Sequence, residues 1–220
     1  MIIAIDGKVA TGKSSVAKEV ARRLAFIYFD TGAMYRSFTW GVLDQKIDPQ
    51  DIEGLKKYLA SFEFDIRIIN GEKRYFVMGK DVSEAIRQPR VTGLVSEVSA
   101  YPFVREKLVE IQREWAKGVN AVFEGRDIGT VVFPDADLKI FLTASPEIRA
   151  KRRLEEWQVK YPEQAESYTL DKMIEEVNKR DSMDSTRETS PLKRAENAIE
   201  IDTSTMTIDD VVSKIVSLSV

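Results

Sequence analysis

Short apolar runs alternate along this chain with segments in which apolar residues recur at helical spacing. The first run, Met1–Ile5, is rich in β-branched residues and stops at Asp6-Gly7, which predicts a buried parallel strand. From Gly12 onward apolar residues recur every three or four positions, and Phe26–Phe29 again has strand character. The pattern therefore predicts a β-α-β unit at the start of the chain.

The rest of the chain largely continues this alternation. Thr31 is expected to cap the next helix, the chain after Pro49 is expected to be irregular, and a polar loop is expected over 182–191. The remaining predicted elements are strands at 119–123, 139–142 and 198–201, and helices at 102–115, from Ser145, over 169–181 and from Ile208, which Thr207 caps. Strands alternating with helices predict an α/β fold with a doubly wound parallel sheet.

Residues 62–90 break the parallel pattern. Phe62–Ile68 alternates apolar and charged residues, Asn70-Gly71 is a dipeptide typical of tight hairpin turns, and strand character resumes at Tyr75. These features predict an antiparallel insert within the parallel fold.

The segment Gly7–Ser14 matches the phosphate-loop pattern G-x-x-x-x-G-K-[ST], between a predicted strand and a predicted helix. Backbone N–H groups of such a loop cradle phosphates, its lysine reaches the β and γ phosphates, and its hydroxyl binds Mg²⁺. The candidate triphosphate-binding residues are Gly7, Lys8, Val9, Ala10, Thr11, Gly12, Lys13, Ser14 and Ser15. We expect Ser14 to be the Mg²⁺ ligand and Lys13 to be a solvent-facing catalytic side chain.

Composition limits the chemistry available to such a site. The 220 residues include neither Cys nor His, which excludes disulfides, thiolate nucleophiles, imidazole bases and Cys/His zinc sites. The net charge of −3 gives no overall positive field that would favour nucleic acid as a partner. No stretch approaches 18 consecutive apolar residues, so we expect a cytoplasmic protein with no membrane partner.

Arginines follow several of the predicted strand and helix ends. The four concerned are Arg36, Arg126, Arg180 and Arg187. An arginine fork binds phosphate through two hydrogen bonds, so together they suit a second anionic substrate. Each arginine alone is typical of a solvated surface charge, and only the placement of the whole set favours a binding site.

Two short segments also match motifs of guanine-nucleotide switches. Asn178–Asp181 matches N-K-x-D, and Asp51–Gly54 matches D-x-x-G. The first lies at the end of a predicted helix and the second has no apolar strand before it, whereas the switch motifs require those strands. We therefore expect both to be chance matches.

Longer segments carry a more specific resemblance. They are Asp30–Arg36, Val95–Ala100, Val104-Arg105, Glu124–Asp135, Arg180-Asp181, Asp184 and Arg187. Through them the chain resembles the bacterial cytidylate kinases of the long type, a family of nucleoside monophosphate kinases, from Ile3 to about Val212. The phosphate loop departs from the family pattern, since Lys8 and Val9 follow the first glycine where proline usually comes next, and Lys8 adds a backbone donor.

The resemblance implies transfer of the γ-phosphoryl group of ATP, with Mg²⁺, to CMP and dCMP in pyrimidine metabolism. The implied acceptor-phosphate contacts are Thr31, Arg36, Arg126 and Arg187, the ribose or phosphate contacts Arg180 and Asp184, the base contacts Ser96, Arg105 and Asp127, and Asp30 is a further substrate-binding residue. Arg149, Arg152 and Arg153 are implied to close over the transferring phosphoryl. The implied catalytic residues are Lys13, Arg126, Arg149 and Arg153.

The resemblance also implies a single phosphate-loop kinase unit made of three parts. These are a core of residues 1–32, 118–145 and 166–220, a monophosphate-binding part of residues 33–117 that contains the insert, and a short helical lid over about 146–165. We expect a monomer whose partners are its small-molecule substrates.

Several alternatives stay open at this level. Glu124 either orients Mg²⁺-bound water or is a structural acid at a strand end, and Asp127 either contacts the base, pairs with Arg126 or caps the next turn. Another small-molecule kinase, for adenylate or shikimate, and a nucleotide-binding switch are the alternative functions.

Overall fold

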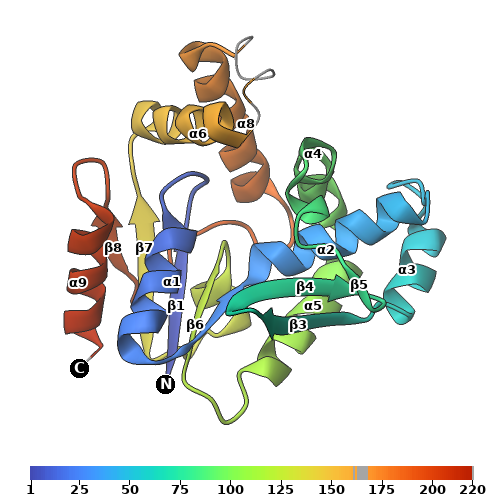
Figure 1. The fold of residues 1–220 in the computed structure, drawn as a ribbon, viewed down its shortest axis with the longest axis horizontal. Coiled ribbons are helices and arrows are strands. Elements are labelled where there is room, and N and C mark those ends of the chain that lie inside the picture. Colours follow the sequence, from blue (N-terminus) through green and yellow to red (C-terminus); the bar gives the residue numbers. More distant parts are fainter. Residues whose placement is uncertain (161, 163–167, 220) are drawn as a thin grey trace. The chain divides into compact units, whose positions relative to one another are not determined.

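The computed structural model describes residues 1–160, 162 and 168–219, and the chain divides into two compact units that are described separately. Unit 1 comprises residues 1–29 and 116–220, and unit 2 comprises Asp30–Trp115. The elements of unit 1 are β1 (Ile2–Gly7), α1 (Lys13–Leu24), β2 (Ile27–Asp30, whose last residue begins unit 2), β6 (Ala121–Gly125), the π-helical turn η2 (Ile128–Val132), β7 (Leu138–Thr143), α6 (Pro146–Lys160), α8 (Leu170–Thr186), β8 (Ile199–Asp202) and α9 (Ile208–Leu218) (Figure 1).

Unit 1 is built on a five-stranded sheet in the order β2-β6-β1-β7-β8. β1 pairs in parallel with β6 on one side and with β7 on the other, and β7 pairs in parallel with β8. The carboxyl ends of the parallel strands meet at one edge of the sheet, which is where ligands bind in folds of this type. The predicted α/β fold with a parallel sheet is confirmed.

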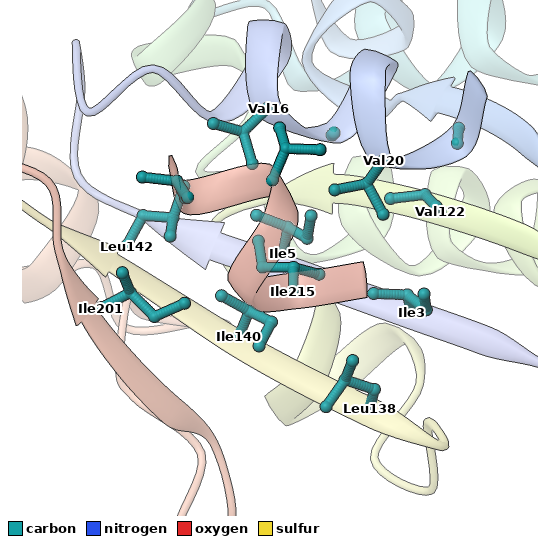
Figure 2. Packing of buried hydrophobic residues seen from close by; sticks show 14 residues of the cluster. Ile3, Ile5, Val16, Val20, Val122, Leu138, Ile140, Leu142, Ile201 and Ile215 are labelled. Carbon is teal, nitrogen blue, oxygen red and sulfur yellow. The ribbon is translucent and has the colours of Figure 1, made fainter. Parts of the chain in front are cut away.

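Helices α1 and α9 cover one face of this sheet, and their apolar stripes form its main core (Figure 2). Val16 and Val20 of α1 and Ile215 of α9 pack on Ile5 of β1 and Ile140 of β7. Each such side chain is almost fully removed from water, which contributes roughly 1.5–3 kcal/mol apiece. This packing holds α1 against β1, and residues 8–12 connect the two elements.

Unit 2 contains helices and a small antiparallel sheet. Its elements are α2 (Thr31–Asp44), α3 (Ile52–Ala60), β3 (Phe64–Ile69), β4 (Glu72–Val77), β5 (Lys80–Asp81), the 3-10 turn η1 (Ala85–Arg87), α4 (Pro89–Val98) and α5 (Pro102–Trp115) (Figure 1). β3 and β4 pair antiparallel across a turn in which Asn70 and Gly71 both have positive φ, 53° and 79°. This geometry is that of a two-residue hairpin turn, so the predicted hairpin is confirmed.

Three local predictions were wrong. Asp30 and not Thr31 caps α2, because its carboxylate accepts a hydrogen bond from the Ala33 N–H at 2.8 Å and Thr31 is already helical. Residues 52–60 form α3, capped by Asp51, where irregular chain was expected. The predicted polar loop over 182–191 begins later, because α8 continues to Thr186.

Candidate active site

The phosphate loop leaves β1 at Gly7, and that glycine is required by its surroundings. Gly7 is paired with Leu142 of β7, and a Cβ on Gly7 would lie 2.2 Å from the Leu142 carbonyl oxygen. Any other residue would push the loop away from the sheet, because real atoms do not approach so closely. The loop is thereby held against the central strands.

The N-terminus of α1 suits an anion. Its N-cap Gly12 has φ 86° and no side-chain cap, and the first turn carries no acidic residue. The N–H groups of this turn and the positive end of the helix dipole are available to phosphate. Ser14 is exposed in the same turn, where its hydroxyl fits a metal ion shared with phosphate oxygens.

Lys13 is buried, with 6% of its surface exposed, so the prediction that it faces solvent was wrong. Its ammonium donates a hydrogen bond of 2.5 Å to the carbonyl of Lys8, within its own loop. The Lys13 ammonium therefore lies against the backbone of the phosphate loop.

The electrostatic surroundings of Lys13 link the loop to the rest of the site. Burial lowers the pKa of Lys13 to about 7, and the nearby charge of Arg126 acts in the same direction. The carboxylates of Glu124, Asp184 and Asp6 act against this shift. A bound polyphosphate would supply negative charge at the same place and favour the protonated lysine.

Asp6 is a site residue that the sequence analysis did not single out. It is 4% exposed, and its carboxylate accepts hydrogen bonds from the N–H groups of Ile128 at 2.8 Å and Gly129 at 2.7 Å. Burial raises the pKa of Asp6 to about 7, although these two hydrogen bonds oppose the rise. Asp6 thus joins the end of β1 to the turn that follows Asp127.

Arginines gather around Asp184 in unit 1. Arg126 donates a hydrogen bond to the Asp184 carboxylate at 2.8 Å, and Arg180 and Arg187 lie 3.8 and 3.9 Å from it. Burial alone would raise the pKa of Asp184, but the three positive charges outweigh burial and hold the pKa below its ordinary value. Four of the predicted substrate-binding residues therefore lie in one cluster.

Asp127 and Glu124 border this cluster. Asp127 is buried, its carboxylate lies 3.9 Å from the Arg187 guanidinium, and it does not cap η2 with its side chain. Glu124 lies near the end of β6 and accepts a hydrogen bond of 2.6 Å from the Tyr28 hydroxyl. This contact gives Glu124 a structural partner, and a role toward Mg²⁺-bound water stays a prediction.

In unit 2, α2 begins with the predicted phosphate contacts. The Asp30 carboxylate caps the helix and also pairs with Arg36 at 3.0 Å, while Thr31 is buried in the first turn. Among the described residues the Nε of Arg36 has no hydrogen-bond partner, so its guanidinium is only partly used by Asp30.

Ser96 and Arg105 are linked within unit 2 through the end of α4. Arg105 is 2% exposed, its guanidinium lies 5.0 Å from the centre of the Tyr35 ring, and it donates to the Ser99 carbonyl at 3.1 Å. Ser99 in turn donates to the carbonyl of Ser96. The buried Ser96 hydroxyl has no hydrogen-bond partner in the described part of the chain, which suits a polar ligand.

The arginines of α6 take different positions. Arg149 is 1% exposed and donates to the carbonyls of Ala144 and Val9, both at 3.1 Å. Its guanidinium is therefore buried against the backbone of the phosphate loop. Arg152 donates to Thr203, and Arg153 is partly exposed beside Glu156. This placement does not favour contact between Arg149 and the phosphoryl group. The predicted lid extends over residues 161 and 163–165, which lie outside the described residues.

The two switch-like motifs are explained by local structure. Asn178–Asp181 lies inside α8, and the Asp51 carboxylate caps α3 by accepting from the Gly54 N–H at 3.0 Å. Neither segment is a loop after a buried strand, so neither is placed to contact a guanine base.

Two features are absent from the described residues. Their acidic side chains form no group of three or more that could hold a metal ion. None of their helices combines the length and the apolar character needed to cross a bilayer.

Comparison with known proteins agrees with this geometry. The family model described as cytidylate kinase matches residues 3–219. The chain is 58% identical to a cytidylate kinase of Protochlamydia amoebophila (strain UWE25) over 98% of this chain and 94% of that protein, and 44% identical to one of Bacillus cereus (strain ATCC 10987 / NRS 248) over the same shares. A solved structure of an uncharacterized protein from Eubacterium ventriosum ATCC 27560 shares the fold, with a TM-score of 0.52 and 14% identity over 99% of this chain and 97% of that one. The chain belongs to the cytidylate kinase family and is a kinase phosphotransferase.

Proposed function

We propose that this protein transfers the γ-phosphoryl group of ATP to CMP and to dCMP, producing ADP and CDP or dCDP. The observation that carries the proposal lies within unit 1, where Lys13 of the phosphate loop interacts electrostatically with Arg126 and Asp184 of the arginine cluster. A triphosphate site beside a second anion site is what transfer between two nucleotides requires. Family membership supplies the class of acceptor.

The donor is proposed to bind residues 7–15, chiefly through backbone N–H groups and Lys13. Mg²⁺, held by phosphate oxygens and the Ser14 hydroxyl, supplies charge neutralisation between the phosphates when it is bound. The uncapped first turn of α1 supports this assignment, because it leaves its donors for a ligand.

The acceptor contacts are proposed residue by residue from the family resemblance. The phosphate is held by Thr31, Arg36, Arg126 and Arg187, with Asp30 positioning Arg36. Arg180 and Asp184 contact the ribose or the phosphate. The base is contacted by Ser96, Arg105 and Asp127. The unpartnered Ser96 hydroxyl and the Arg36 Nε support two of these assignments. The ion pairs of Asp184 explain how three like charges stay close before an anion arrives.

The chemistry needs no strong general base, because the attacking group is already a phosphate anion. A chain that contains no His can therefore catalyse this transfer. The protein's contribution is to align the two phosphates and to stabilise negative charge on the transferring group with Lys13, Arg126 and Arg153. We further propose a monomer that acts in the cytoplasm on these small molecules.

A coupled assay of ADP formation with ATP and Mg²⁺ tests the proposal across CMP, dCMP, UMP, AMP and shikimate. We expect the highest kcat/KM with CMP or dCMP. Higher kcat/KM with AMP or shikimate would assign the chain to another small-molecule kinase. Tight GTP binding with little transfer to any acceptor would favour a nucleotide-binding switch.

A further inference from the structure

Val9, the third residue of the phosphate loop, is held on both of its backbone polar groups by one buried ion pair. Its N–H donates to Oδ1 of Asp181 in α8, and its carbonyl accepts from Nη1 of Arg149 in α6, both at 3.1 Å. The same Arg149 nitrogen lies 2.6 Å from Oδ2 of Asp181. Arg149 and Asp181 thus form a closed ring of contacts with Val9.

Burial makes this ring stronger than a surface contact. The side chains of Arg149 and Asp181 are 1% and 9% exposed, so water competes little for their charges. Hydrogen bonds to charged groups are also stronger than neutral ones. The Nε of Arg149 donates to the Ala144 carbonyl, which ties the ring to the chain directly after β7.

The side chain of Val9 adds an apolar contact to the same two helices. It packs against a small core formed by Ala150 of α6 and by Met173 and Val177 of α8. Backbone and side chain of Val9 therefore both join the phosphate loop to the α6–α8 pair. Of these two helices, α6 carries Arg153, the partly exposed arginine proposed to act on the phosphoryl group.

We infer that Arg149 and Asp181 are positioning residues that set the conformation of the phosphate loop through Val9 and couple ATP binding to α6 and α8. This inference rests on the proposed binding of ATP by the loop. In this role Arg149 acts behind the loop and does not touch the phosphoryl group. None of the ring's hydrogen bonds goes to a proposed acceptor residue, and the ring meets that site only through the charge of Asp181 on Arg126. Loss of the ring should therefore weaken MgATP binding far more than CMP binding.

Two substitutions weaken the contacts of the ring, one at Asp181 and one at Val9. Asp181→Asn removes the charge and keeps the size of the side chain. Val9→Pro removes the N–H donor and replaces the side chain that packs on α6 and α8 with a smaller apolar ring. The position lies directly before Ala10, whose φ of 57° is that of a turn that accepts proline one residue earlier. Asp171→Asn is the matched control, since it makes the same change on an exposed position of α8.

We expect each ring variant to raise the Kd for MgATP about tenfold or more and to leave the KM for CMP within about twofold. In the double variant the effects on the MgATP Kd should be far from additive, because both changes act on one connected set of contacts, Asp181→Asn at the ion pair with Arg149 and Val9→Pro at the hydrogen bond to residue 181. A purely structural role would lower the active fraction without separating the two substrates. Additive effects, or an unchanged Kd for MgATP in a folded variant, would overturn the inference.

Hydrogen exchange provides a readout that does not depend on turnover. In the wild type, a non-hydrolysable ATP analogue with Mg²⁺ should slow exchange in α6 and α8 as well as in the loop, and in Asp181→Asn only in the loop. Equal protection of the helices in both proteins would contradict the coupling. If the wild type binds ATP but does not phosphorylate CMP, the proposed function fails while these binding measurements still decide the inference.

Discussion

Arg126 and Asp184 form an ion pair with 2.8 Å between the arginine Nε and the carboxylate Oδ2, and this pair anchors the arginine cluster. Asp184→Asn leaves three arginines without their shared negative charge. We expect a loss of about 3 kcal/mol in the free energy of unfolding, at the lower end for buried pairs because Arg126 keeps 22% of its side chain exposed. Guanidinium chloride titration at pH 7 measures this loss.

Glu200→Gln is the control for this prediction, because it breaks the exposed pair between Arg194 and Glu200. Its cost should stay below about 1 kcal/mol. Equal losses in the two variants would mean that the Asp184 cluster contributes no more than a surface ion pair.

Lys13→Met should reduce kcat by about 10³-fold or more, the scale for losing one group that stabilises transition-state charge. Methionine keeps most of the buried volume, so the variant should fold. Steady-state kinetics with ATP and CMP, beside a circular dichroism spectrum, checks both statements. Near-normal turnover in a folded variant would show that Lys13 of the phosphate loop does not take part in the reaction.

Asp6 should make stability depend on pH near neutrality. Burial raises its folded pKa from 3.8 to about 7, with the charge of Asp127 adding to the rise and the two N–H donors and Lys13 opposing it. The folded state therefore binds more protons than the unfolded state between about pH 4 and 7. The contribution of Asp6 is fully present below pH 4, falls as the pH rises to 7, and is constant above it.

Unfolding by guanidinium chloride between pH 4.5 and 8 tests this dependence. Asp6→Asn removes the titrating group, so its stability should decline less steeply over that range than that of the wild type. The slopes are compared and not the absolute values, because asparagine also loses one hydrogen bond to the Ile128–Gly129 backbone. Parallel curves for the two proteins would show that Asp6 ionises normally.

Asp127→Asn should narrow the preference for CMP over UMP. A carboxylate accepts from the N4 amino group of cytosine but opposes O4 of uracil, and each unsatisfied buried group costs roughly 1–3 kcal/mol. In the proposed base site Arg105 also opposes the N3 hydrogen of uracil, so we expect the wild type to favour CMP about 10²-fold or more in kcat/KM. An amide can be turned to donate to O4, so the ratio should fall in the variant. An unchanged ratio would place base recognition elsewhere.

Periodicity predicted the elements whose apolar stripe is unbroken, such as α1 and α5. It missed α3, where Gly54 and two lysines interrupt a short buried face of Leu55, Tyr58 and Leu59. The predicted end of α8 was also too early, because the last residues of this helix are mostly polar and show no apolar stripe. Asp181 and Asp184 are buried there through their ion pairs with arginines.

The part of the site that a single local motif forms could be predicted from the sequence. The phosphate loop follows from eight consecutive residues. The role of Asp6 was not predictable, because a single acid before a glycine also fits a turn, and its partners at 128–129 become neighbours only when β1 pairs with β6. Similarly, the sequence shows Arg149 as one of several charges on a helix and gives no sign of its burial against Asp181.

β1 is the middle strand of its sheet, so the loop that it carries cannot come apart by fraying at an edge. A ligand on that loop therefore stabilises unit 1 as a whole against unfolding, by about 2.7 kcal/mol at a hundred times its Kd. The melting temperature of the protein should rise with nucleotide concentration. Inside a cell, the survival of the enzyme against proteases would then follow the supply of its own substrate.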